Sequence, residues 1–483
     1  MSRIIVGPFN RVEGDLELTL DIADGRVEAA RVTTPLYRGF EQILVGRPAA
    51  DALVVAPRIC GICSLSQSIA AASALRALEG LVPAPNGELA TNIAHAAENI
   101  ADHLTHFYLF FMPDFARREY ANEPWFAAVE ARFKAISGAA ANAVLPARTR
   151  LLHIMGLIAG KWPHSLAIQP GGVTRTLDLG EKMRLIAIVA EFRAFIETTL
   201  FAAPLEAVTG LETIEALDNF VEGAGASGDF AAFMRLARTL ELDDLGRGAN
   251  PLMSFGAYAS QAGPLFSAGV YAPRTGEKTN LALGLIEEDV ACAYMRDSSP
   301  DPALAQTIPD ADRDGAYSWA KAPRLDKSPA EVGALARQAV DGNKLARALL
   351  AQKGASSVMS RVVARMIEIA RLTQAAGDWA RALRLQDPFC VASAKFVEGR
   401  SAGMIEAARG SLGHWVTVKN DVIESYQIIA PTTWNFSPRD GRGVPGPLEQ
   451  ALVGVETGDL GARAPTIQHV VRSFDPCMVC TAH

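Results

Sequence analysis

The sequence predicts an α+β fold that is predominantly helical, with a long central helix bundle and small β regions near the two ends of the chain. Three observations support this prediction: polar and apolar residues alternate over the first 35 positions, apolar residues recur at helical spacing through the middle, and a strand-like pattern follows Gly410. The 483 residues contain no Ser/Gly linker, low-complexity tract or repeat of fixed period. We therefore expect a single interwoven domain over 1–483.

The first region, 1–35, has the pattern of a β-hairpin. Apolar and polar residues alternate over 16–21, Asp24-Gly25 has the composition of a tight turn, and a second apolar run covers 27–32. This alternation predicts that one face of each strand packs against the core.

The middle region, 86–405, is predicted to be mainly helical. Apolar residues recur at helical spacing from Glu88 to Phe111, and Pro113 ends this pattern. Comparable patterns predict further helices at 179–201, 230–240 and 330–383, the last one broken near Lys353-Gly354.

The last region, 410–483, is predicted to be β-rich and to return to the functional site. Strand-like residues occupy 415–418 and 426–433, with turn residues at 420–421 between them. A loop rich in Gly and Pro follows at 438–447.

Charge and hydropathy exclude two classes of partner. The 46 basic and 53 acidic side chains give a net charge of −7, which lacks the basic surplus expected of a nucleic-acid-binding surface. The longest uncharged stretch, 248–273, is too rich in Gly, Pro, Ser, Asn and Gln for a membrane-spanning helix, so we expect no direct membrane insertion. Without the pattern of a secretory signal peptide near Met1, a cytoplasmic location is expected.

Four of the six cysteines form two Cys-x-x-Cys pairs, Cys60/Cys63 and Cys477/Cys480. Two such pairs supply the four thiolates that zinc, iron or nickel prefer. A structural zinc site is one interpretation, although zinc modules usually separate their pairs by roughly 15–20 residues. A thioredoxin-like redox pair would leave the second pair unexplained. The metal therefore stays open on spacing alone.

The residues around the two pairs resemble the signature motifs of nickel-iron hydrogenase large subunits. RICGIC covers 58–63 and DPCMVCTAH covers 475–483. Further blocks that resemble this family, in the expected order, are RVEG at 11–14, RGFE at 38–41, DHLTHFY at 102–108, PGGV at 170–173, EAARG at 406–410 and PTTWN at 431–435. The resemblance implies the hydrogenase large-subunit fold and cleavage of H₂ into hydride and proton.

The resemblance also implies a metal centre and its ligands. Cys60, Cys63, Cys477 and Cys480 would bind nickel, and Cys63 and Cys480 would also bridge to an iron. The implied cofactor is a Ni-Fe(CO)(CN)₂ centre, and Thr432 matches a residue that hydrogen-bonds one cyanide. The remaining cysteines, Cys292 and Cys390, are expected to be buried apolar residues.

Four charged residues match family positions around this centre. Glu13, expected on the early hairpin, resembles the glutamate of a proton relay, although a solvated strand carboxylate is the ordinary alternative. Asp102 and Arg409 resemble charged residues over the open metal position, and they could equally form a structural ion pair. Asp475 matches the remaining active-site aspartate.

A second metal site is implied by the same resemblance. Glu41 and His483 match the ligands of a buried Mg²⁺, with a backbone carbonyl near Ile428 as a third ligand. Oxygen donors suit this hard cation.

Three departures from the usual family pattern bear on function. Gln67 stands four residues after Cys63, where catalytic members usually have histidine; glutamine is characteristic of the hydrogen-sensing, regulatory branch and cannot titrate. Ile62 replaces the common valine, and Phe110 adds a bulky side chain to the helix that carries Asp102. We expect these two to narrow the gas path and to favour oxygen tolerance.

The cysteine count predicts a partner. Beyond the two pairs, two isolated cysteines are too few for an iron-sulfur cluster of the usual four-thiolate type. The resemblance implies a small subunit that carries the clusters, in a heterodimer or a dimer of heterodimers, together with maturation chaperones. A sensor would also need a signalling histidine kinase.

The leading functional hypothesis is a hydrogen-sensing nickel-iron hydrogenase large subunit with low turnover. An energy-conserving uptake hydrogenase is the alternative within enzymes. A non-catalytic zinc-binding scaffold is the alternative from another class.

Overall fold

The computed structural model describes residues 2–260, 263–393 and 396–483. Near the N-terminus, β1 (Ser2–Val6), β2 (Glu17–Ala23) and β3 (Arg26–Thr33) form an antiparallel sheet in the order β1-β2-β3. The β2–β3 pair is the predicted hairpin, and Asp24 and Gly25 both have positive φ at its turn. β1 is an additional strand that the sequence pattern did not indicate.

The first cysteine pair follows two short helices and precedes a longer one. The short helices are α1 (Phe40–Leu44) and α2 (Ala52–Val55), and the longer helix α3 (Ser64–Glu79) begins directly after Cys63. α3 ends at Gly80, whose left-handed φ of 61° closes the last turn without a Cβ clash.

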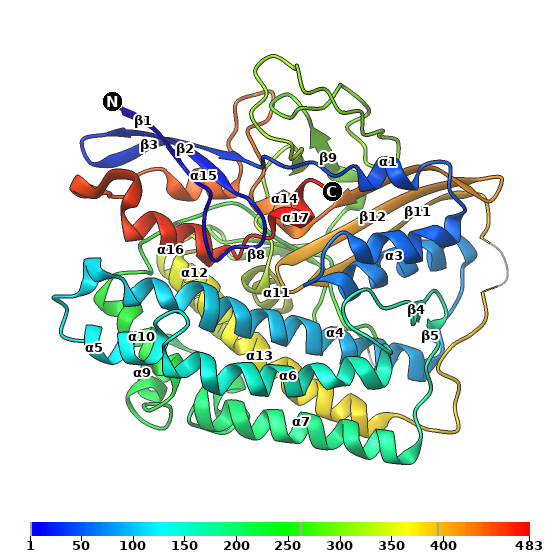
Figure 1. The fold of residues 1–483 in the computed structure, drawn as a ribbon, viewed down its shortest axis with the longest axis horizontal. Coiled ribbons are helices and arrows are strands. Elements are labelled where there is room, and N and C mark those ends of the chain that lie inside the picture. The colour runs from blue at the N-terminus through cyan, green and yellow to red at the C-terminus, as the bar shows by residue number, and fades with distance from the viewer. Residues whose placement is uncertain (1, 261–262, 394–395) are drawn as a thin grey trace.

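Four long helices form the central bundle, and they lie across the lower half of Figure 1. The predicted 88–111 helix is present as α4 (Pro85–Thr105), which continues into a π-helical turn over His106–Phe111 before Pro113. α4 is buried on nearly all sides between its neighbours. The other three are α6 (Ala139–Ile158), α7 (Leu179–Thr199) and α13 (Val358–Ala382).

Shorter helices complete the helical part of the chain. The predicted 330–383 pattern comprises three helices, and Gly354 in the left-handed region ends the second of them. The shorter helices are α5 (Phe126–Phe133), α8 (Leu205–Thr209), α9 (Ile214–Glu222), α10 (Asp229–Thr239), α11 (Ala334–Asp341) and α12 (Lys344–Lys353).

The structure departs from a mainly helical 86–405 body in one long stretch. Between α10 and α11, the described residues form short strands and loops and contain no α-helix, because Gly, Pro and Ser interrupt every apolar run there. The strands of this stretch are β6 (Leu252–Ser254), β7 (Gly269–Ala272), β8 (Glu277–Thr279), β9 (Ile286–Asp289) and β10 (Ala322–Leu325). A smaller pair, β4 (Ile168–Gln169) and β5 (Gly172–Val173), precedes α7.

The C-terminal region is β-rich only in its first part. An antiparallel sheet of β11 (Gly399–Ala407), β12 (Gly410–Lys419) and β13 (Val422–Ile429) packs against α3. The expectation of a β-rich 410–483 is wrong after Ile429. Three of the following helices start at a proline, which suits the first helical position because its missing N–H needs no partner there. These three are α14 (Pro431–Asn435), α15 (Pro447–Leu452) and α16 (Pro465–Ser473). A last helix, α17 (Met478–Thr481), follows them.

One large cluster of buried apolar side chains includes residues of the N-terminal sheet, the bundle and all four paired cysteines. The C-terminus lies in the middle of the molecule beside α14 and α17 (Figure 1). None of the described helices combines the length and the apolar character needed to cross a membrane.

Candidate metal centre

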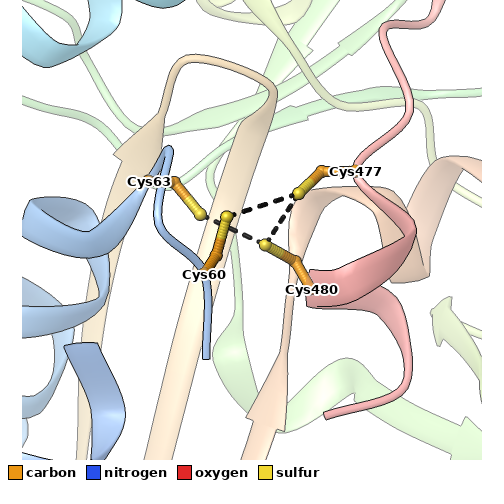
Figure 2. A group of neighbouring side chains, drawn as sticks. All are labelled: Cys60, Cys63, Cys477 and Cys480. Atoms are coloured by element: carbon orange, nitrogen blue, oxygen red, sulfur yellow. Dashed lines mark hydrogen bonds between the residues drawn. The ribbon is translucent and has the colours of Figure 1, made fainter. Parts of the chain in front are cut away.

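Two distant segments bring the four paired cysteines together (Figure 2). Cys63 is the N-cap residue of α3, Cys477 is the N-cap residue of α17, and Cys480 lies within α17. The Sγ–Sγ distance is 3.1 Å for Cys63–Cys480, 3.0 Å for Cys477–Cys480 and 3.6 Å for Cys60–Cys477. All four sulfurs lie within 4.8 Å of one another, are buried, and belong to free cysteines.

The four cysteines differ in pKa, and only the Cys60 thiol loses its proton readily. Hydrogen bonds from the thiols of Cys477 and Cys480 hold the pKa of Cys60 well below its usual range. A hydrogen bond to Cys477 raises the pKa of Cys63, and likewise that of Cys480, well above the usual range. A metal ion between the sulfurs would favour the thiolate form of all four.

Glu13 ties the N-terminal segment to the second cysteine pair. Its N–H donates to the carbonyl of Pro476 at 3.4 Å, and its carbonyl accepts from the N–H of Met478 at 2.7 Å. Burial, and then the charge on Cys60, raise the pKa of its carboxyl. The expectation that Glu13 lies on the hairpin is wrong: it precedes β2, where left-handed Gly14 lets the loop turn against Val479.

Arg38 is a bridging residue that the motif analysis did not single out. Its guanidinium donates to the carbonyls of Ile59 and Val479, one beside each cysteine pair. It lies in the RGFE block, so the resemblance marked its position without indicating this contact.

A buried guanidinium lies beside the cysteines. Arg409 donates through Nη1 to Asp102 Oδ2 at 2.7 Å, through Nη2 to Asp475 Oδ1 at 3.2 Å, and through Nε to the Asp475 carbonyl at 3.0 Å. The predicted Asp102–Arg409 contact is therefore present. Within the described residues, Asp102 Oδ1 and Asp475 Oδ2 have no hydrogen-bond partner.

The two carboxylates of this group differ electrostatically. Burial raises the pKa of Asp102 to about 7, although Arg409 opposes the shift. Burial would also raise the pKa of Asp475, but Arg409 together with His106, Arg365 and His103 more than offsets it, and the pKa lies below its usual value. The pair thus combines one easily protonated carboxyl with one held ionised.

Gln67 and Thr432 lie close to the cysteine segments. Gln67 is fully buried on α3, and its Oε1 lies 2.8 Å from His414 Nε2, while His414 Nδ1 lies 2.7 Å from the Tyr426 hydroxyl. Burial lowers the pKa of His414 to about 3, so this group of three is neutral. The Thr432 hydroxyl accepts from the N–H of Cys477 at 3.1 Å, which leaves its own O–H free to donate.

The predicted second metal site has two of its three ligands in contact. Glu41 Oε1 lies 3.3 Å from His483 Nε2, and His483 Nδ1 donates to the Cys480 carbonyl at 2.8 Å. Ile428 contacts Glu41 through its N–H, at 2.8 Å, and an N–H cannot bind a cation. Lys321 approaches Glu41 Oε1 to 3.4 Å, and although burial opposes ionisation, Lys321 and His483 lower the pKa of Glu41 to about 2.

The remaining predicted residues have less defined surroundings. Ile62 packs partly buried against the core, and its N–H points to Cys60 Sγ at 3.3 Å. Phe110 is half-buried in the π-helical turn that continues α4. The expectation that Cys292 and Cys390 are buried is wrong, because both lie in irregular segments and are only half-buried.

Two further buried residues contact these segments and were not predicted. Glu98, one helical turn before Asp102 on α4, binds the start of α3. Arg337 donates to the carbonyls of Ala407 and Ala408, directly before Arg409. Glu98 is a charged residue within the apolar pattern of α4, which is a weak signal because the same helix carries other charged residues; nothing in the sequence marks Arg337.

A family model described as nickel-dependent hydrogenase matches residues 38–124 and 120–483. The chain belongs to this family. The periplasmic NiFeSe hydrogenase large subunit of Desulfomicrobium baculatum is 28% identical, over 100% of this chain and 95% of that relative. The uptake hydrogenase large subunit of Rhodobacter capsulatus is 24% identical, over 100% and 95%.

Solved structures agree with the family assignment. The reduced Ni-Fe-Se hydrogenase from D. vulgaris Hildenborough has a TM-score of 0.85 at 28% identity, over 100% of both chains. H₂-activated NiFeSe hydrogenase from Dm. baculatum gives 0.84 at 28%, again over 100% of both chains. This confirms the predicted hydrogenase large-subunit fold. The chain is the large subunit of a nickel-dependent hydrogenase, and its four-cysteine cluster is the site for a nickel-iron centre.

Proposed function

We propose that the chain binds H₂ and splits it at a Ni-Fe(CO)(CN)₂ centre held by Cys60, Cys63, Cys477 and Cys480, with Cys63 and Cys480 bridging to iron. The converging buried sulfurs carry this proposal, because their donor set suits soft metals and a metal ion would favour the thiolate form of all four. When bound, such a centre supplies the redox chemistry that withdraws electrons from H₂.

The chain's own residues receive and move the proton. Glu13 lies against the Cys477 segment with a raised pKa, as suits a group that accepts a proton and releases it again. Arg409, held by Asp102 and Asp475, places fixed positive charge in a water-poor site, where such charge acts most strongly. The free O–H of Thr432 is the donor that we assign to a cyanide ligand.

Hydrogen sensing is the role that Gln67 favours. Gln67 cannot titrate, its partner His414 is neutral, and the Gln67 amide nitrogen finds no partner in the described part of the chain. A slow reaction that signals the presence of H₂, rather than one that conserves energy from it, fits such a site. The named relatives favour the second candidate, an energy-conserving uptake enzyme.

Partners and location follow from the same proposal. Electrons would leave through a small subunit bearing iron-sulfur clusters, in a heterodimer or a dimer of heterodimers, after assembly by maturation chaperones. A histidine kinase would read the signal, and the complex would be cytoplasmic. Mg²⁺ would bind Glu41 and His483, with the carbonyl of Ile428 or the nearby Gln427 side-chain oxygen as a further ligand.

Infrared spectroscopy of the matured complex, combined with turnover, tests these proposals. We expect bands from metal-bound carbon monoxide and cyanide, and slow H₂ oxidation that Gln67→His accelerates and makes pH-dependent near neutrality. Gln338→His, on α11, is a control for the substitution itself. Rapid wild-type oxidation that Gln67→His leaves unchanged would favour the uptake enzyme.

The zinc scaffold is disfavoured by the nickel-dependent family match. The same preparation tests it by metal analysis. Zinc in place of nickel and iron, with no carbon monoxide or cyanide bands, would support the scaffold and contradict the hydrogenase proposal.

A further inference from the structure

Glu98 is a buried acid with an unusually complete set of donors. It lies on α4 with 2% of its surface exposed. Its Oε1 accepts from the N–H and the hydroxyl of Ser66, at 2.8 and 2.7 Å. Its Oε2 accepts from the N–H of Leu65 at 2.8 Å and from the indole N–H of Trp162 at 3.0 Å.

The two backbone donors are the first-turn N–H groups of α3. Such groups have no partner within their own helix and are usually capped by the side chain of the N-cap residue. That residue here is Cys63, and its sulfur makes no capping hydrogen bond. The sulfur instead faces Cys480. The carboxylate of Glu98, from another helix, therefore accepts the hydrogen bonds that an N-cap side chain would normally accept.

We propose that Glu98 is a positioning residue that fixes the start of α3 so that the Cys63 sulfur is free and correctly placed for the metal centre. This rests on the assignment of Cys63 as a metal ligand, proposed above. Asp102, which binds Arg409, lies one helical turn further along α4. One helix thus sets the place of both the first cysteine pair and the guanidinium.

An ordinary structural cap would not need this arrangement. A Ser, Thr or Asp at the N-cap position stabilises a helix without burying a carboxylate, whereas burial raises the pKa of Glu98 to about 7 in spite of its four donors. A conventional N-cap side chain would require replacing Cys63. The chain instead buries the Glu98 carboxyl, which is unfavourable in free energy.

Glu98→Gln is the direct test, because it keeps the shape but turns one acceptor into an N–H₂ that faces donors. In the metal-free subunit, we expect amide exchange over 59–67 to be about tenfold faster or more. In the matured complex, we expect less bound nickel and shifted infrared bands of the iron ligands. The first readout needs no metal, so it tests the positioning even if the metal assignment is wrong.

Glu449→Gln is the matched control. Glu449 is also buried with a pKa raised to about 7 by burial, and it also accepts from a backbone N–H, that of Val32. The Glu449→Gln variant should leave amide exchange over 59–67 and the infrared bands of the iron ligands unchanged. Trp162→Phe, which removes one donor, serves if Glu98→Gln does not fold, and should give a smaller effect of the same kind. Wild-type exchange and unshifted bands in a Glu98 or Trp162 variant, or equal effects in the control, would overturn the proposal.

Discussion

The planar guanidinium of Arg409 donates three hydrogen bonds. Its Nε and both terminal nitrogens donate to Asp475 and Asp102, which are far apart in the sequence. A lysine at this position carries the same charge but cannot reproduce the fork. The two carboxylate oxygens that have no partner among the described residues lie in this buried group and remain available to orient a small molecule or a proton.

Ile62 and Phe110 are the residues at which we expect gas access to be set. Replacing them together, Ile62→Val with Phe110→Leu, removes bulk beside Cys60 and from the turn that continues α4. We expect H₂ oxidation to persist and inhibition by O₂ to become faster, because the larger molecule gains most from a wider path. Residual activity after timed exposure to air measures the effect.

The control for this pair removes comparable atoms elsewhere. Ile214→Val with Phe220→Leu changes α9, whose residues contact neither cysteine segment in the described contacts. If the Ile62/Phe110 variant keeps wild-type oxygen tolerance, the gas-path hypothesis is wrong.

At the scale of elements, buried ion pairs join helices to the turn that carries Arg409. Arg337, on α11, donates to Glu368 of α13 at 2.6 and 2.9 Å and to Glu406 of β11 at 2.8 Å. It also binds the carbonyls of Ala407 and Ala408, at 2.8 Å each. This guanidinium holds the β11–β12 turn, and with it the backbone of Arg409, against the bundle.

Arg337→Met should therefore destabilise the chain strongly. It leaves the carboxylates of Glu368 and Glu406 buried without their main cation, and loss of one partner from such a pair costs about 3–5 kcal/mol. Chemical denaturation of the subunit measures the loss. Arg150→Met, which breaks an exposed pair with Glu191, should cost at most about 1 kcal/mol. Equal losses in the two variants would contradict this account.

Elements with a regular pattern were predictable, and those built by tertiary contacts were not. The hairpin and α4 follow from hydrophobic periodicity, which is a local property. The helices after Ile429 are not predicted because they are short and separated by loops, and the residues over 426–433 and 438–447 have strand-like and loop-like composition. At the site, motif resemblance located the cysteines, Asp102 and Arg409. Glu98 and Arg337 each act through several contacts with residues that are distant in the sequence, and such contacts leave no periodic trace in the sequence.

At the scale of the whole molecule, the first and last segments of the chain meet in the core. Cys60 and Cys477 are 417 positions apart, yet their sulfurs are 3.6 Å apart. Glu13 pairs with Pro476 and Met478, while His483 reaches Glu41. A metal ion bound by the four sulfurs would therefore join segments that are far apart in the sequence.

Removing the metal should destabilise the contact between the first and last segments more than it destabilises the central helix bundle. A ligand that binds only the folded state stabilises it, and the metal-free sulfurs keep only one favourable charge among four. We expect the metal-free subunit to unfold at a lower temperature and to exchange amide protons faster over 474–483, with α13 unchanged. Exchange mass spectrometry of subunits from nickel-supplied and nickel-depleted cells measures both regions. Cys292→Ser, outside the cluster, should reproduce the wild-type difference. Equal protection of 474–483 in the two preparations would mean that the protein contacts of Glu13 and His483 close the chain without the metal.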